Sequence, residues 1–307
     1  MGTAELSCAS LKALAEGLEV IAVVTQPDKP KGRHLKLLPT PVKVMAESLS
    51  IPVLQPSRAR NEEFIEQLRA LRPELIAVAA YGQILPAAIL DLPPLGCLNV
   101  HTSLLPKYRG AAPIQWAILN GEEETGVTIM KMDVGLDTGA IVTQERTPIR
   151  PEDNAATLHD RLAEIGAELL VRTIPDYTGG KFLPQPQPAE GVSHAPKIKK
   201  EDGRIDWSKS AQWVWNRVRG LVPWPGAFTS MGGGEGQMLR IWEAQVVPGQ
   251  GSPGEIMQAE KHGLVIACGE GAIRVVRLQR EGGRQMTIQE FLAGHKLQRG
   301  DKLGAVV

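Results

Sequence analysis

The first half of the chain alternates short apolar runs with helical patterns, and this alternation constrains the fold more than any other feature of the sequence. Helical patterns precede the first two runs, and a further helix is expected near 112–119. The runs themselves are predicted to be buried strands: 20–24, 75–79, 97–100 and 127–130. Strands that alternate with helices form βαβ units. The sequence therefore predicts an α/β fold with a doubly wound, mostly parallel, Rossmann-like sheet covered by helices on both faces.

Beyond this region the pattern of the chain changes twice. An amphipathic helix is expected at about 155–175, and the alternate prolines of 184–188 then exclude regular structure. A helix at 208–220 precedes short strands separated by glycine turns, which favours a small C-terminal β-barrel of the oligonucleotide-binding (OB) type. These strands are expected at 226–230, 238–247, 263–268 and 271–278. We predict three regions: a first domain at 1–183, a linker at 184–203 and a C-terminal domain at 204–307.

Composition and cysteine spacing narrow the class of protein. No apolar run reaches the roughly 18–20 residues that span a bilayer, and the first residues do not form a secretory signal. The three cysteines are far apart and form neither a disulfide framework nor a metal-binding pair. No histidine has a ligand partner at a suitable spacing, so no metal is expected. We expect a cytoplasmic, monomeric protein.

The charges are distributed unevenly along the chain. The sequence holds 34 Lys and Arg against 34 Asp and Glu, which gives a formal net charge of zero. From Lys197 onward there are 16 basic and 11 acidic residues. A basic C-terminal third indicates an anionic partner, although an ordinary solvated surface explains the same charge equally well.

Polar residues that could carry chemistry follow two of the predicted strands. Asn99 and His101 stand two residues apart at the end of one strand, so both side chains point to the same face. The next strand ends in the loop 133–139, which has two glycines and two carboxylates, Asp133 and Asp137. An amide, an imidazole and a carboxylate together could stabilise a tetrahedral oxyanion and move a proton. By spacing alone, a polar strand end and a plain turn explain these residues as well.

The wider context of these residues resembles a known family. Asn99-Val100-His101, the following Ser103 to Pro106, and the loop 133–139 are similar to the 10-formyltetrahydrofolate-dependent formyltransferases. The loop 25–43 resembles the branch of that family that formylates methionyl-initiator tRNA. Segments of the linker and C-terminal region resemble the same branch: 195–198, 205–207 and 223–227. The resemblance covers nearly the whole chain.

The resemblance implies roles for individual residues. It places Asn99, His101 and Asp137 in the catalytic trio, with 10-formyltetrahydrofolate as the formyl donor. It implies that the folate contacts one stretch of four residues: Ser103, Leu104, Leu105 and Pro106. It also implies that Arg33 reaches the end of the tRNA acceptor stem. Other basic residues are expected to contact the tRNA backbone: Lys31, Lys36, Lys197 and Lys199. The prolines and Gly32 of the loop 25–43 are expected to keep it out of regular structure.

The start of the sequence departs from the family pattern. Family members begin with an apolar strand that leads into Gly-Thr-Pro, whereas here Met1 directly precedes Gly2-Thr3-Ala4. The first strand of the sheet is therefore expected to be absent. Either the natural chain starts further upstream, or this is an impaired variant, and Ala4 in place of proline affects the same loop.

Three functions share the predicted trio. The acceptor could be methionyl-initiator tRNA, or it could be glycinamide ribonucleotide or a nucleotide amino-sugar in a sibling enzyme. The loop 25–43 favours the tRNA. A rival from another class is a catalytically idle homologue that binds tRNA, which the absent first strand would explain.

Overall fold

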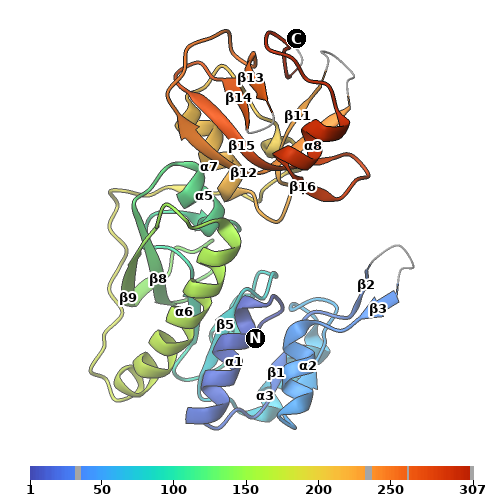
Figure 1. Cartoon of the computed structure of the whole chain (residues 1–307). Coiled ribbons are helices and arrows are strands. Elements are labelled where there is room, and N and C mark those ends of the chain that lie inside the picture. The colour runs from blue at the N-terminus through green and yellow to red at the C-terminus, as the bar shows by residue number, and fades with distance from the viewer. Residues whose placement is uncertain (32–35, 232–236, 261–262, 305–307) are drawn as a thin grey trace. The chain divides into compact units, whose positions relative to one another are not determined.

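The computed structural model describes residues 1–31, 36–231, 237–260 and 263–304 (Figure 1). Its contacts divide the chain into two compact units. The first unit comprises Met1–Pro113, Glu124–Pro148 and His159–Pro196. The second comprises Ile114–Glu123, Ile149–Leu158 and the chain from Lys197 onward. No helix in these described ranges is long and apolar enough to cross a membrane.

Helices and strands alternate through the first unit and the segments that interrupt it. The helices are α1 (Leu6–Gly17), α2 (Pro41–Ser48), α3 (Glu62–Leu71), α4 (Ala87–Leu90), α5 (Pro113–Leu119) and α6 (Ala155–Thr178). The strands are β1 (Val23–Val24), β2 (Lys29–Lys31), β3 (Lys36–Leu38), β4 (Val53–Leu54), β5 (Ile76–Ala79), β6 (Cys97–His101), β7 (Arg109–Gly110), β8 (Glu124–Lys131), β9 (Ala140–Pro148) and β10 (His194–Ala195).

The main sheet of the first unit is mixed, so the predicted mostly parallel sheet is wrong. Its strand order is β5-β6-β8-β9. The pair β5–β6 is parallel, whereas β8 runs antiparallel to both β6 and β9. The physical reason is the connection 102–123, which returns the chain to the edge of the sheet at which β6 ends. The alternation of strands and helices along a sequence does not reveal at which edge a connection delivers the next strand.

Helix α6 packs on this sheet. Its apolar stripe is buried as predicted, with Leu162 wholly buried. A Cβ on Gly166 would lie 2.7 Å from Val100 of β6, so only glycine allows the helix this close to the strand. A hydrogen bond of 2.8 Å between the hydroxyls of Thr143 and Thr173 joins the helix to β9. Figure 1 shows α6 running alongside β8 and β9.

On the N-terminal side of the first unit, the strands do not join the main sheet. Strands β1 and β4 form a separate parallel pair. Of the residues that the structure describes, Met1 and Gly2 bridge β1 and β5: the Gly2 N–H donates to Val24 O at 2.9 Å, and Gly2 forms a parallel bridge with Ala79. The predicted strand 20–24 is regular only at its last two residues.

The loop 25–43 contains regular structure, contrary to the prediction. Strands β2 and β3 pair antiparallel, with Pro30 opposite Leu37. Proline is tolerated because a two-stranded ribbon leaves one edge of each strand unpaired. The base of the hairpin is fixed by Asp28, which accepts hydrogen bonds from Lys43 Nζ at 2.8 Å and Gln55 Nε2 at 2.7 Å.

The second unit is built around an antiparallel sheet. Its strands are β11 (Ala227–Ser230), β12 (Met238–Val247), β13 (Ile256–Glu260), β14 (Gly263–Ala267), β15 (Ala272–Arg280) and β16 (Gln285–Thr287). Its helices are η1 (Lys200–Gly203), α7 (Ala211–Gly220) and α8 (Ile288–Gly294). The strand order is β11-β12-β15-β14-β13, with β16 on β15. The predicted strands correspond to β11, β12, β14 and β15, whereas β13, β16 and α8 were not predicted.

The C-terminal segment connects the two edges of this sheet. Leu303 donates its N–H to Gly254 O beside β13, and Gly304 donates to Ser230 O of β11. Inside, Trp207 is buried and its indole N–H donates to Thr229 Oγ1 at 3.0 Å. These contacts enclose an apolar core that includes Phe291 of α8, whose side chain is wholly buried.

Candidate active site

Strand β6 carries two of the predicted catalytic side chains. Asn99 and His101 occupy alternate positions, so they project from the same face of the strand. His101 lies opposite Thr128 of β8, and Asn99 lies opposite Met130. Asn99 is half-buried, and no described residue forms a hydrogen bond with its side-chain amide. The amide is therefore free to hydrogen-bond a substrate.

Asp137 reaches His101 by a route that the sequence did not indicate. Because β8 is antiparallel to β6, its carboxyl end lies beside Leu98, at the start of β6 and away from His101. The connection 132–139 folds back and brings Asp137 Oδ2 to 3.8 Å from His101 Nδ1. Asp137 has a φ of +54°, a left-handed conformation that few residues other than glycine adopt. The trio thus assembles through this loop, because the carboxyl ends of β6 and β8 lie at opposite edges of the sheet.

His101 is buried between two acceptors. Its Nε2 lies 3.0 Å from Tyr108 O, and because a carbonyl only accepts, Nε2 carries the proton of that hydrogen bond. Burial lowers the pKa of His101 below its ordinary value, while the Asp137 carboxylate and the Tyr108 carbonyl oppose that shift. Burial thus favours the neutral ring, and its Nδ1 faces the Asp137 carboxylate.

The backbone around Asp137 is held by residues that sequence reasoning missed. The Gly110 N–H donates to Asp137 Oδ2 at 2.8 Å. The side-chain amide of Gln187 donates to Asp137 O and to Gly139 O, each at 2.8 Å. Arg109 in turn donates to Gln187 Oε1 from Nη2 at 2.7 Å. Gln187 lies in the proline-rich stretch, where no periodic pattern marks a residue as structural, so no signal in the sequence identified it.

The stretch predicted to contact folate is fixed by Thr128. The Leu105 N–H donates to Thr128 Oγ1 at 3.1 Å, and that hydroxyl donates to Ser103 O at 2.7 Å. Gln144 Nε2 donates to Leu105 O and to Thr128 Oγ1, each at 2.9 Å. Ser103 and Leu105 are buried, whereas Leu104 and Pro106 are half-buried. Only the half-buried pair presents side-chain surface to a ligand.

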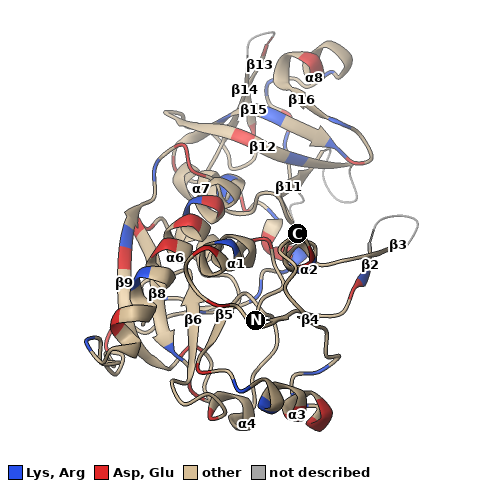
Figure 2. Ribbon diagram, turned by 90° about the horizontal axis from the view of Figure 1, so that it is seen from below, with Lys and Arg blue, Asp and Glu red and all other residues tan. Residues whose placement is uncertain are grey.

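The structure locates only some of the residues predicted to contact tRNA. Arg33 lies outside the described residues, as do the side chains of Lys31 and Lys36. Lys197 and Lys199 are exposed in the second unit, on either side of the buried Ile198. Figure 2 shows basic residues interspersed with acidic ones along α6 and β9. Within the described ranges, no group of three or more His, Cys, Asp or Glu residues could hold a metal ion.

Comparison with known proteins defines the family. A family model described as formyl transferase matches residues 3–174, which is more than half of the chain. A second model, formyl transferase, C-terminal domain, matches residues 197–296. The chain therefore belongs to the formyl transferase family, and the family predicted from the sequence is confirmed.

Curated relatives are similar along nearly their whole length. The methionyl-tRNA formyltransferase of Citrifermentans bemidjiense is 50% identical over 305 residues, which cover 99% of this chain and 95% of the relative. The methionyl-tRNA formyltransferase of Caldanaerobacter subterraneus subsp. tengcongensis is 50% identical over 304 residues, with coverages of 98% and 97%.

Solved structures with lower identity share the fold. The N-formyltransferase of Helicobacter canadensis, solved with folinic acid and dTDP-3-aminofucose, has a TM-score of 0.66 at 19% identity. The match covers 89% of this chain and 96% of that one. HypX from Aquifex aeolicus, solved with tetrahydrofolic acid, has a TM-score of 0.58 at 20% identity, with coverages of 84% and 47%.

Proposed function

We propose that this formyltransferase moves the formyl group of 10-formyltetrahydrofolate to the free α-amine of methionyl-initiator tRNA. The single observation that carries the proposal is the 50% identity over nearly the full chain with enzymes of that name. The shared face of Asn99 and His101 on β6, with Asp137 beside His101, supports the proposal, because these groups suit such a transfer. We also propose that the enzyme works in the cytoplasm, because its proposed acceptor is a substrate of translation.

The geometry supports a direct transfer in which one proton moves from the attacking amine to the leaving nitrogen. The amine attacks the formyl carbon, and the new C–N bond gives a tetrahedral oxyanion. The Asn99 amide donates a hydrogen bond to that oxyanion. His101, neutral before the reaction, accepts the proton of the amine at Nδ1, and Asp137 stabilises the resulting imidazolium. The proton then passes to N10 of the folate as the C–N10 bond breaks.

The steps assign a specific protonation state to His101 before the reaction. The alternative is a His101 that is already protonated before the reaction and stabilises the oxyanion from the start. Burial lowers its pKa, so the charge arises only when the imidazole has taken the proton of the amine. The positive charge then appears together with the oxyanion, which is when it stabilises the reaction most.

The folate donor is proposed on two supports. The related structures from Helicobacter canadensis and Aquifex aeolicus were solved with folinic acid and tetrahydrofolic acid. In this chain, the stretch Ser103 to Pro106 lies two residues beyond His101 and is fixed by Thr128 and Gln144. We assign this stretch to folate contact, with Leu104 and Pro106 offering the side-chain surface.

The tRNA is proposed to contact both units. Asp28 fixes the base of the β2–β3 hairpin through hydrogen bonds to Lys43 and Gln55. A fixed base supports the proposal that the basic loop 25–43 reaches the end of the tRNA acceptor stem. In the second unit we assign the sheet to an OB-like barrel, because its C-terminal segment connects the two edge strands. We assign catalysis to 1–183, the linker to 184–203 and tRNA binding to 204–307. We also propose a monomer as the working form.

The second candidate acceptor is a nucleotide amino-sugar. The structure from Helicobacter canadensis was solved with dTDP-3-aminofucose, and it shares the fold over 89% of this chain. Its 19% identity is far below the 50% of the tRNA-acting relatives, so we rank this acceptor second.

A competition assay tests the proposal. The purified chain is given 10-formyltetrahydrofolate and equal concentrations of methionyl-initiator tRNA, glycinamide ribonucleotide and dTDP-amino-sugar. We expect formylation of the tRNA at a kcat/KM at least about a hundred times that of the other two. Preferential formylation of either small acceptor would replace the proposal with the sibling activity, and no formylation of any acceptor would indicate an idle homologue.

A further inference from the structure

The stretch predicted as an interdomain linker packs, over its first residues, against the backbone of the first unit. Strand β10 of this stretch pairs parallel with β7. A Cβ on Gly110 of β7 would lie 2.6 Å from Ala195 O, so only glycine allows the two strands this close. Strand β7 directly follows Tyr108, whose carbonyl accepts the hydrogen bond from His101 Nε2. The linker stretch therefore lies beside the backbone that orients the imidazole.

Ser193, the residue before β10, contacts two successive N–H groups of that backbone. The Tyr108 N–H donates to Ser193 Oγ at 2.9 Å, and the Arg109 N–H donates to Ser193 O at 2.9 Å. Ser193 is half-buried, and its own N–H donates to Pro106 O at 3.4 Å. One residue of the linker stretch thus holds the backbone on both sides of Tyr108.

The peptide group between Tyr108 and Arg109 connects Ser193 to the imidazole. Its N–H belongs to Arg109 and donates to Ser193 O, whereas its carbonyl belongs to Tyr108 and accepts from His101 Nε2 at 3.0 Å. A trans peptide group is planar, so its N–H and its C=O point in opposite directions and turn together. The orientation that Ser193 gives to the N–H therefore also sets the direction of the carbonyl that faces His101.

Tyr108 has a backbone conformation that depends on its surroundings. Its φ is +62°, in the left-handed region that residues with a large side chain rarely adopt. Such a conformation persists only where neighbouring contacts hold it. The hydrogen bond from the Tyr108 N–H to Ser193 Oγ is one of these contacts. Loss of the hydroxyl would allow Tyr108 to relax toward negative φ, which turns its carbonyl away from His101.

Two acceptors compete for the proton of the neutral imidazole. The Tyr108 carbonyl holds it on Nε2, whereas the Asp137 carboxylate, 3.8 Å from Nδ1, favours the other nitrogen. A neutral ring carries a single N–H, so the stronger contact decides the tautomer. In the proposed reaction Nδ1 accepts the proton of the attacking amine. A ring that already carries its proton on Nδ1 cannot accept that proton, so the tautomer controls the rate.

We propose that Ser193 is a positioning residue for formyl transfer: it holds the backbone of Tyr108 so that the Tyr108 carbonyl keeps the proton of His101 on Nε2. Ser193 acts through Tyr108 and not on the reacting atoms. The inference rests on the proposed function, in which His101 moves the proton of the amine. Gln187 of the same stretch donates to Asp137 O, so the start of the linker supports both partners of the imidazole.

Three substitutions of Ser193 test the proposal by their effect on catalysis. Ser193→Ala removes the hydroxyl, and Ser193→Thr and Ser193→Val form a matched pair of equal shape in which only threonine keeps a hydroxyl. We expect the alanine and valine variants to lower kcat for methionyl-initiator tRNA about tenfold, because one hydrogen bond that orients the imidazole is lost. The KM values for tRNA and 10-formyltetrahydrofolate should stay within about twofold of those of the unchanged chain, as should the kcat of Ser193→Thr.

The tautomer of His101 is a measurement that a merely structural role of Ser193 would not change. Nitrogen NMR of the free protein with isotope-labelled histidine reports which ring nitrogen carries the proton, and the signals lost in His101→Gln assign this ring. At a pH at which the ring is neutral, we expect the proton on Nε2 in the unchanged chain and in Ser193→Thr. In Ser193→Ala and Ser193→Val we expect a mixture with the proton on Nδ1.

Two results would overturn the proposal. The same tautomer in Ser193→Val as in the unchanged chain would show that Ser193 does not act on the ring, and equal kcat values for Ser193→Thr and Ser193→Val would show that the hydroxyl has no role. If the alanine and valine variants are recovered only as aggregate, Ser193→Thr decides: the proton on Nε2 supports the proposal, and a mixture contradicts it.

The NMR measurement separates this inference from the proposed function, because it needs no substrate. A chain that formylates no tRNA contradicts the proposed function, and the tautomers of Ser193→Thr and Ser193→Val then support or overturn the role of Ser193 by themselves.

Discussion

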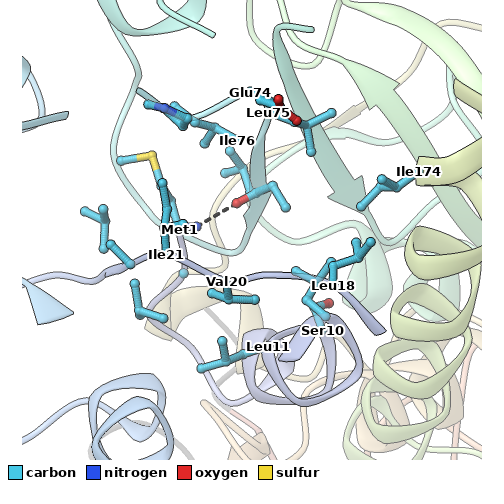
Figure 3. Close-up of a pocket in the computed structure, with 18 of the residues that line it drawn as sticks. Met1, Ser10, Leu11, Leu18, Val20, Ile21, Glu74, Leu75, Ile76 and Ile174 are labelled. Carbon is cyan, nitrogen blue, oxygen red and sulfur yellow. Dashed lines mark hydrogen bonds between the residues drawn. The ribbon is translucent and has the colours of Figure 1, made fainter. Parts of the chain in front are cut away.

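The two sides of the first unit are built from the same kinds of element but are packed in opposite ways. On the side of β6, β8 and β9, strands pair continuously, and Leu98 and Ile129 are wholly buried. On the side of β1 and β5, Met1 and Gly2 are the only described residues that connect the strands, and an apolar cavity of about 700 Å³ lies beside them (Figure 3). The residues proposed to act in catalysis, Asn99, His101 and Asp137, all belong to the side of β6, β8 and β9.

The residues proposed for catalysis are held by contacts outside the loosely packed N-terminal side of the first unit. Asn99 and His101 lie on a strand that is paired on both sides, and Asp137 is held by Gly110 and Gln187. None of these contacts uses β1, although β5, which pairs with β6, also lines the cavity. The catalytic geometry is therefore expected to persist where the N-terminal side is loosely packed, and loss of stability and loss of catalysis should follow from different substitutions.

The largest expected effect is on catalysis. We predict that Asn99→Ala lowers kcat by about 100- to 1,000-fold, because it removes the amide that stabilises the oxyanion. Thermal unfolding should be unchanged, since no described residue forms a hydrogen bond with that side chain. Asn61→Ala, an exposed asparagine at the start of α3, is the matched control and should retain full activity. Formyl transfer under saturating substrates measures both, and near-normal turnover of Asn99→Ala would remove it from the site.

The second prediction compares the two sides by stability. Leu162 and Leu170 are both wholly buried in α6, but only Leu170 lines the cavity. We expect Leu162→Ala to lower the free energy of unfolding by about 3–5 kcal/mol and Leu170→Ala by about 2 kcal/mol. The smaller cost arises because Leu170 already lacks packing partners on one side. Urea unfolding measures the difference, and equal costs would contradict the contrast drawn between the two sides.

The third prediction concerns the loop that carries Asp137. Gln187→Ala should lower kcat about tenfold, equivalent to about 1.4 kcal/mol in the barrier, because the loop 137–139 loses the two hydrogen bonds that fix its backbone. Gln185→Ala is the control, since its side-chain amide donates only to Leu183 O. A kcat for Gln187→Glu close to that of the unchanged protein would contradict the role of these hydrogen bonds, because a carboxylate cannot donate to the two carbonyls.

The smallest expected effect is on the pH dependence of stability. The pKa of His101 is lowered in the folded protein, so between that pKa and about 6.5 the unfolded chain binds more protons. Stability from the neutral imidazole is therefore present above pH 6.5 and is lost as the pH falls. Urea unfolding at pH 7.5 and 5.5 should show a larger loss for the natural chain than for His101→Gln. A larger loss for the variant would reverse the sign of the inferred shift.

Much of the site could be predicted from the sequence, and the part that could not has a physical reason. Asn99 and His101 follow from strand periodicity, and the resemblance to the family added Asp137. Gln187 could not be predicted because its role depends on where the proline-rich stretch packs. The loop 25–43 was expected to lack regular structure, yet β2 and β3 form a hairpin. A proline prevents hydrogen bonding at its own nitrogen, but it does not prevent a strand from pairing along its other edge.

The sequence by itself determined the family, the α/β alternation of the first unit and the two side chains on β6, because these depend on local pattern and on motif. Only the tertiary structure decided that β8 runs antiparallel and that Asp137 returns to His101 through a folded-back loop. It also decided that the first unit is densely packed on one side and open at a cavity on the other. Strand direction and cavity volume depend on contacts between residues far apart in the chain, which local patterns do not encode.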